Sequence, residues 1–191
     1  MRVIAGTAGG IHLIVPKRGV RPTMDRVKAA MFSSLGEVVI GARVLDLFAG
    51  SGALGLEALS RGAASVIFVD KDSQSIAVIE KNLARANLVG RIHRQDVFVF
   101  LRRSVGKETF DLIFADPPYE KTESGERYIE KLLANQALPQ LLESDGLFVL
   151  EKQPGESIGR TNFWRIVRAQ TYGATELVFL SLSCNRPSAS K

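Results

Sequence analysis

A glycine-rich segment directly after an apolar strand constrains the fold of this chain more than any other feature. Residues Gly50–Gly55 match the pattern G-x-G-x-x-G, and the apolar run Val44–Phe48 precedes them. A buried strand that turns through such glycines into a helix is typical of α/β folds that bind nucleotide-like ligands, because glycines let the backbone approach the ligand closely. Asp70 ends the next apolar run, twenty residues after Gly50. In such folds an acid at this position accepts hydrogen bonds from ribose hydroxyls.

The rest of the chain alternates apolar strands with amphipathic helices. We expect strands at 44–48, 65–69, 91–95, 111–115 and 147–151, and helices at 53–60, 73–86, 97–103 and 128–142, the last broken near Pro139. Only five residues separate two further strands, 163–170 and 176–183, which favours an antiparallel pair. This order predicts an α/β fold with a mostly parallel seven-stranded sheet and a C-terminal antiparallel pair. Ligands of such sheets bind at the carboxyl ends of the strands.

The first part of the chain predicts a small hairpin, formed by residues 2–5 and 11–15, and then a helix. Thr23 is the predicted N-cap of this helix, Asp25 lies in its first turn, and its apolar stripe stops at Gly36. We therefore divide the chain into a basic N-terminal arm (1–22), one α/β domain with its N-terminal helix (23–185) and a frayed tail (186–191).

The excess positive charge of the chain is concentrated near its start. The net charge is +5, and residues 1–28 hold six basic side chains and one acidic side chain, whereas the remaining 163 residues hold 19 of each. Such a distribution is expected if the arm contacts a polyanion, and an ordinary solvated basic stretch is the alternative.

Several classes of protein are disfavoured by composition. The single Cys184 excludes an internal disulfide and a multi-cysteine metal site, and His12 and His93 lack metal-ligand spacing. We therefore predict no metal. No apolar run approaches the roughly twenty residues of a membrane span, and the start lacks a signal-peptide pattern. We expect a cytoplasmic protein without a membrane partner.

A second motif, Asp116-Pro117-Pro118-Tyr119, follows the apolar run 112–115. Two consecutive prolines stiffen the loop and remove two backbone donors. The loop offers a carboxylate, a free carbonyl and an aromatic face, which together can hold a flat ring that bears an amino group. The alternative is a strand terminator with a solvated aspartate and a packing tyrosine.

The glycine loop taken alone also fits an NAD-dependent oxidoreductase. Asp46 argues against this, since it lies inside the strand, where a buried anion would not help a pyrophosphate but would favour a ligand with an ammonium group. An oxidoreductase also gives the Asp116–Tyr119 loop no role, and no catalytic His or Tyr/Lys pair is evident.

These motifs resemble those of a known class of enzymes. Asp46–Gly52, with the sequence D-L-F-A-G-S-G, is similar to the first motif of class I S-adenosylmethionine-dependent methyltransferases, and Asp116–Tyr119 to the fourth motif of those that methylate exocyclic amino nitrogens. With Arg21–Val27 and Phe48–Ala63, the chain resembles the RsmD family of bacterial guanine-N2 methyltransferases of small-subunit (16S) rRNA. The resemblance implies the Rossmann-like class I fold. One departure is Thr7–His12, which lacks the Lys or Arg common in the family and leaves open whether the hairpin contacts RNA.

The resemblance also implies a cofactor, S-adenosylmethionine, which becomes S-adenosylhomocysteine. Asp46 would hold its amino group, Asp70 its ribose hydroxyls, and Asp96 its adenine amino group, although Asp96 could also cap the following helix. The implied cofactor-binding residues are Asp46, Phe48, Gly50, Ser51, Gly52, Asp70, Lys71, Asp96 and Val97.

The implied catalytic residues are Asp116, Pro117, Pro118 and Tyr119. Asp116 and the Pro117 carbonyl would accept the two amino hydrogens and turn the nitrogen lone pair towards the methyl group, while Tyr119 would stack on the base. The implied RNA-binding residues are Arg18, Arg21, Thr23, Arg26 and Lys28. Arg26 and Lys28 lie on the polar side of their helix, so a solvated face or a salt bridge is the alternative for both.

The expected partner is small-subunit rRNA or the assembling 30S particle, bound by a monomer. Within the same class, a DNA adenine-N6 or cytosine-N4 methyltransferase is the alternative, although the short chain has no evident target-recognition domain. An NAD-dependent oxidoreductase and a non-catalytic RNA-binding protein are the alternatives from other classes. The modified nucleotide is not predicted.

Overall fold

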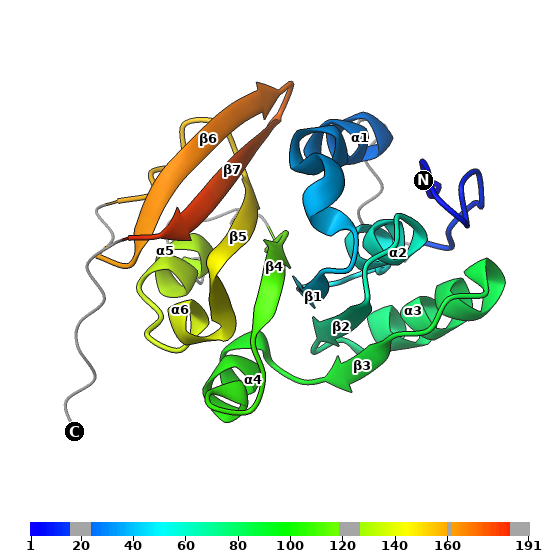
Figure 1. The fold of residues 1–191 in the computed structure, drawn as a ribbon, viewed down its shortest axis with the longest axis horizontal. Helices are drawn as coiled ribbons and strands as arrows, with labels where there is room; N and C mark the ends of the chain where they lie inside the picture. The colour runs from blue at the N-terminus through cyan, green and yellow to red at the C-terminus, as the bar shows by residue number, and fades with distance from the viewer. Residues whose placement is uncertain (16–23, 119–126, 160–161, 184–191) are drawn as a thin grey trace.

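A seven-stranded sheet runs through the centre of the molecule, with helices on both of its faces (Figure 1). The structure, a computed structural model, describes residues 1–15, 24–118, 127–159 and 162–183. In these residues the strand order is β3-β2-β1-β4-β5-β7-β6. The strands from β3 to β5 in this order are parallel, and β7 is antiparallel to both β5 and β6. The predicted fold class is confirmed.

Most helices and strands lie within two residues of their predicted ranges. The strands are β1 (Arg43–Leu47), β2 (Ser65–Asp70), β3 (Arg91–Arg94), β4 (Phe110–Ala115), β5 (Leu142–Lys152), β6 (Trp164–Tyr172) and β7 (Thr175–Leu182). The helices are α1 (Met24–Leu35), the 3-10 helix η1 (Gly36–Val39), α2 (Ala53–Ser60), α3 (Ser73–Ala86), α4 (Val97–Ser104), α5 (Tyr128–Leu133) and α6 (Leu138–Leu141). The predicted N-cap Thr23 and the tail 186–191 lie outside the described residues.

Alternating side chains of the central strands fill two hydrophobic cores. Val44 of β1 faces the core that α1, α2 and α3 cover, and Leu45 faces the core that α4, α5 and α6 cover. Because successive side chains of a strand point to opposite faces, continuous apolar strands are needed when both faces are buried. The strands β1, β2 and β4 meet this need, and the cores on either side hold their carboxyl ends at one edge.

The largest difference from the sequence prediction lies between α4 and β6. The helical stretch predicted at 128–142 is broken near Pro139, as expected. The helix α5 ends at Leu133 and α6 starts at Leu138, where the Asn135 side chain accepts hydrogen bonds from the backbone N–H groups of Ala137 and Leu138. The strand β5 begins at Leu142, five residues earlier than predicted. Its register with β4 shifts between Phe110 and Leu112, and such irregularities leave little trace in an apolar pattern.

The N-terminal segment 1–15 forms the predicted small hairpin, which packs on α2. Its hairpin pairing comprises the antiparallel bridge Arg2–His12 and backbone hydrogen bonds from Val3 N–H to the Ile11 carbonyl (2.9 Å), from Gly10 N–H to the Val3 carbonyl (2.9 Å) and from Leu13 N–H to the Met1 carbonyl (3.1 Å). The Glu57 carboxylate accepts hydrogen bonds from the backbone N–H groups of Ile4 and Ala5, at 2.7 and 3.1 Å. Side chains of α2 therefore satisfy backbone groups that a longer hairpin would pair.

Candidate active site

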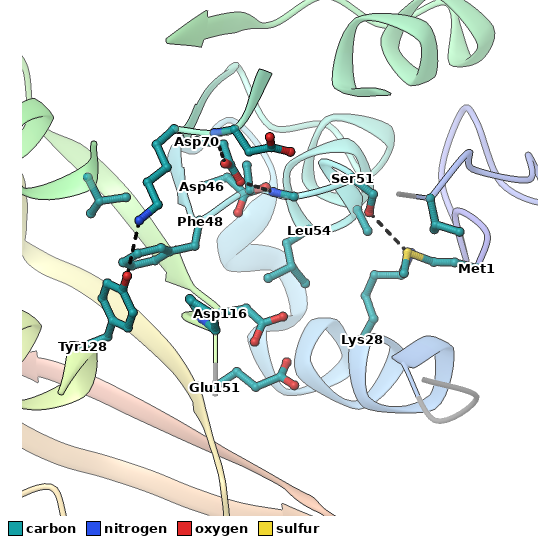
Figure 2. Close-up of a pocket in the computed structure, with 18 of the residues that line it drawn as sticks. Met1, Lys28, Asp46, Phe48, Ser51, Leu54, Asp70, Asp116, Tyr128 and Glu151 are labelled. Carbon is teal, nitrogen blue, oxygen red and sulfur yellow. Dashed lines mark hydrogen bonds between the residues drawn. The ribbon is translucent and has the colours of Figure 1, made fainter. Parts of the chain in front are cut away.

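A cavity of about 380 Å³ lies at the carboxyl ends of β1, β2 and β4, a size suited to a small ligand (Figure 2). The predicted residues that line it are Lys28, Asp46, Phe48, Gly50, Ser51, Asp70, Lys71, Asp96, Val97, Asp116 and Pro118. Of the other predicted residues, Gly52 and Pro117 belong to the same two loops, and Arg26 is exposed on α1. Arg18, Arg21, Thr23 and Tyr119 lie outside the described residues.

The turn after β1 brings backbone to the cavity wall. Phe48 has a φ of 56°, in the left-handed region that non-glycine residues seldom adopt, and Gly52 has a φ of 75°. A side chain on Gly55 would place its Cβ 2.3 Å from the Phe68 ring, so the glycine lets α2 pack directly on β2. The Phe48 ring packs edge-on against Tyr128, at 5.3 Å between centroids. The left-handed residue is thus fixed by packing, as is typical of strained positions at functional sites.

Asp46 is a buried carboxyl group in the wall of the cavity. Its side chain reaches the start of α2, where Oδ2 accepts a hydrogen bond from the Gly55 backbone N–H at 2.9 Å, and the residue is only 2% exposed. Burial, helped by the negative charge of Asp70, raises the pKa of Asp46 to about 8. At neutral pH Asp46 is therefore mostly protonated.

Asp70, at the end of β2, organises the glycine loop. Its Oδ2 accepts from the Gly50 N–H at 2.8 Å, and its Oδ1 accepts from the Asp72 N–H at 2.9 Å. Each carboxylate oxygen has two lone pairs, so the group retains capacity for further donors. Its predicted role with ribose hydroxyls is compatible with this structural role and stays a prediction.

Asp96 precedes α4 and lines the cavity. Its Oδ1 accepts a hydrogen bond from the Val99 backbone N–H at 3.1 Å, so Asp96 is the N-cap of α4. The capping alternative is confirmed. Contact with an adenine amino group would use the remaining acceptor capacity of the carboxylate and stays a prediction.

Asp116 and Glu151 lie on the same wall, at the ends of two neighbouring parallel strands. Ala115 of β4 pairs with Leu150 of β5, and Asp116 and Glu151 are the next residues on each strand. Figure 2 shows both carboxyl groups directed into the cavity, one beside the other. Pro117 is buried and fixes the start of the loop.

Two residues that the sequence analysis missed also line the cavity. Glu151 directly follows the apolar run 147–150 within β5, on the strand next to the Asp116 loop, and this position was the signal that could have found it. Tyr128 starts α5, where its ring stacks on Phe98 at 6.4 Å between centroids and its hydroxyl contacts the Lys71 ammonium at 3.5 Å. No sequence pattern marked Tyr128.

Asn82 of α3 ties the N-terminal segment to the glycine loop. Its side chain is fully buried, donates to the Ile14 and Ser51 carbonyls, each at 2.9 Å, and accepts from the Ile14 N–H at 2.8 Å. The Ser51 hydroxyl also contacts the Met1 sulfur at 3.5 Å. The start of the chain is thereby part of the cavity wall.

Lys28 is buried, so its predicted position on the polar side of its helix is wrong, whereas the salt-bridge alternative for Lys28 is confirmed. Its side chain is 4% exposed, its Nζ lies 3.2 Å from Oε2 of Glu57, and it donates a hydrogen bond to the Arg2 carbonyl. Burial lowers the pKa of the Lys28 ammonium, against the attraction of Glu57. The fully buried Glu57 explains the position, because a buried carboxylate is costly unless it is paired. Lys28 is its second cationic partner, since Arg61 Nε lies 2.7 Å from the other carboxylate oxygen, Oε1.

Two further findings concern only the described residues. None of their helices has the length and apolar character needed to cross a membrane. They contain no group of three or more His, Cys, Asp or Glu side chains that could hold a metal ion.

The sheet order, with its antiparallel seventh strand, and the glycine loop at the cavity define a class I, Rossmann-like methyltransferase fold. Residues 1–181 match the family described as Conserved hypothetical protein 95. YlbH of Bacillus subtilis is 39% identical over 92% of this chain and 95% of its own length. Ribosomal RNA small subunit methyltransferase D of Haemophilus influenzae is 31% identical over 91% of this chain and 89% of its own length.

A solved structure agrees with these relatives. The structure of yhhF from Escherichia coli superposes with a TM-score of 0.79 and 31% identity, over 97% of this chain and 99% of that one. The chain belongs to the family described as Conserved hypothetical protein 95, the RsmD family that the sequence motifs predicted.

Proposed function

We propose that this protein transfers a methyl group from S-adenosylmethionine to the exocyclic N2 of a guanine in small-subunit (16S) rRNA. The observation that carries the proposal is the single cavity that joins the glycine loop and Asp46 to the Asp116 loop. The Haemophilus relative, named a small-subunit rRNA methyltransferase, supports the rRNA substrate.

The residues of the cavity fit this cofactor. Asp46 is a buried acid whose pKa, raised to about 8, would fall when the cofactor ammonium approaches and favours the carboxylate. Asp70 and Asp96 line the same cavity with acceptor capacity for ribose hydroxyls and an adenine amino group. The bound cofactor supplies an electrophilic methyl group on a sulfonium.

The Asp116 loop would orient the target amino group. Asp116 and the Pro117 carbonyl accept its two hydrogens, which turns the nitrogen lone pair out of conjugation and towards the methyl group. Asp116 also stabilises the positive charge that develops on nitrogen. Alignment of nitrogen, carbon and sulfur, with water excluded, supplies most of the remaining acceleration. The proton leaves after transfer, so Asp116 need not be a strong base.

The basic arm would contact the RNA backbone. Arg18, Arg21, Thr23 and the exposed Arg26 are the proposed contacts, and Lys28 is excluded because Glu57 occupies its ammonium. Tyr119 would stack on the flipped base, which offsets about 1–3 kcal/mol of the cost of unstacking it. We propose a monomer that acts in the cytoplasm on small-subunit rRNA, alone or in the assembling 30S particle.

Transfer of labelled methyl groups tests the substrate class. The protein should label unmodified small-subunit rRNA or assembled subunits that lack the modification, and leave duplex DNA unlabelled. Label in DNA alone would favour the adenine-N6 or cytosine-N4 alternative. Calorimetry should show binding of S-adenosylhomocysteine but not of NAD, and the reverse would favour an oxidoreductase.

A further inference from the structure

Glu151 is a second carboxylate on the wall that holds Asp116. It lines the cavity from β5, one strand away from Asp116, and its backbone follows the Ala115–Leu150 pair by one residue. The Thr175 hydroxyl of β7 donates to Glu151 Oε1 at 3.4 Å, and Thr175 is itself buried. The glutamate therefore projects from a rigid, doubly paired strand, β5, which β4 and β7 flank.

The Asp116 loop alone does not choose among bases. It offers two acceptors for an amino group, and adenine, cytosine and guanine all carry one. The bases differ at the ring nitrogen beside that group. Guanine has two ring nitrogens beside its amino group: N1, which bears a hydrogen, and N3, which bears a lone pair. Adenine N1 and cytosine N3, the ring nitrogens beside the amino groups of those bases, bear a lone pair. An acceptor placed beside Asp116 is thus complementary to guanine and repels the other two bases.

We propose that Glu151 accepts the N1–H of the target guanine and so determines the base specificity of the enzyme. This inference rests on the proposed function, and it assigns Glu151 a contact with the substrate base. A site built around such a hydrogen bond discriminates strongly, because the wrong base would cover the Glu151 carboxylate and leave it facing a lone pair.

The sharpest probe is 2-aminopurine at the target position. It keeps the 2-amino group, but its N1 bears a lone pair, as in adenine. Ligation of a synthetic oligonucleotide into small-subunit RNA places it at the nucleotide that mass spectrometry identifies as methylated. The value of kcat/KM is then measured on guanine and 2-aminopurine RNA for the wild type, Glu151→Gln and Glu80→Gln. Glu80 is an exposed carboxylate on α3, outside the cavity lining, so its variant is the matched control.

The wild type should prefer guanine by at least about 100-fold. Glu151→Gln should narrow this preference by about 10-fold or more, because its amide can either accept from N1–H or donate to a lone pair. Glu80→Gln should keep the wild-type preference. 2-Aminopurine also lacks the O6 of guanine. This loss affects the wild type and the variant alike, so it cancels when their guanine preferences are compared.

Two outcomes overturn the inference while leaving the proposed function intact. The first is a wild type that uses 2-aminopurine as well as guanine, a result that does not depend on how any variant folds. The second is a Glu151→Gln variant that binds S-adenosylhomocysteine normally and keeps the full guanine preference. If unsubstituted RNA yields methylated adenine or cytosine, or no methylated base, the proposed function and the inference both fail.

Discussion

Asp46→Asn should change how the stability of the ligand-free protein depends on pH. Asn matches the shape of a protonated aspartate, and its carbonyl oxygen can still accept the hydrogen bond from Gly55. The variant therefore reproduces the neutral form of the site and removes only the possibility of ionisation.

The magnitude and the sign of this pH dependence follow from the raised pKa of Asp46. In the native protein Asp46 keeps its proton up to a pH of about 8, whereas an unfolded aspartate releases it near a pH of about 3.9. Between these values the native state binds more protons, so the contribution of Asp46 is fully present below a pH of about 4 and is lost as the pH rises through about 8. At about 1.4 kcal/mol per pH unit, the wild type should lose about 4 kcal/mol relative to the variant between pH 5 and pH 8.

Urea unfolding of both proteins at several pH values measures this difference, because all other titrating groups are common to the two. Asp145→Asn, at an exposed aspartate before Gly146, is the matched control and should follow the wild type. A difference between Asp46→Asn and wild type that stays constant from pH 5 to pH 8, or that grows in favour of the wild type, would refute the reasoning.

Three further substitutions test the site and its supports. Asp116→Asn should slow methyl transfer by about 100-fold or more, since the charge on nitrogen loses its stabilisation, while calorimetry shows unchanged binding of S-adenosylhomocysteine; equal transfer rates would contradict the role of Asp116. Lys28→Met should lower the free energy of unfolding in urea by about 1–2 kcal/mol, because the buried Glu57 charge then keeps only Arg61 as a cationic partner, and a second change, Glu57→Gln, should recover part of the loss. Asn82→Ala should weaken binding of S-adenosylhomocysteine by about 5- to 10-fold, because the Ser51 carbonyl loses its buried donor; unchanged affinity would show that the glycine loop does not need this contact.

The sequence predicted the fold well because the central strands carry a strong local signal. Continuous apolar runs that end in Asp70 or in the Asp116 loop mark strands buried on both faces, and the glycines after Leu47 mark the turn into α2. The start of β5 at Leu142 was missed, because a register shift has no periodic signature.

Site residues that belong to contiguous sequence motifs were predicted. Site residues that come together only through the packing of different strands or helices were missed. The glycine loop and Asp116 belong to contiguous motifs, whereas Glu151 reaches the cavity only through the pairing of β5 with β4. A salt bridge of Lys28 was one alternative, but the sequence did not identify its partner, because Glu57 lies on another helix. Contacts between distant segments of this kind are decided by tertiary packing, which propensity and spacing do not contain.

The most direct test of the account is the identity of the methylated nucleoside. Unmodified small-subunit rRNA is incubated with the protein and S-adenosylmethionine that carries an isotopically labelled methyl group, then digested to nucleosides for mass spectrometry. We predict that the label appears in N2-methylguanosine with the wild type and is absent with Asp116→Ala. Label in N6-methyladenosine or N4-methylcytidine, or none in rRNA and assembled subunits alike, would contradict the account.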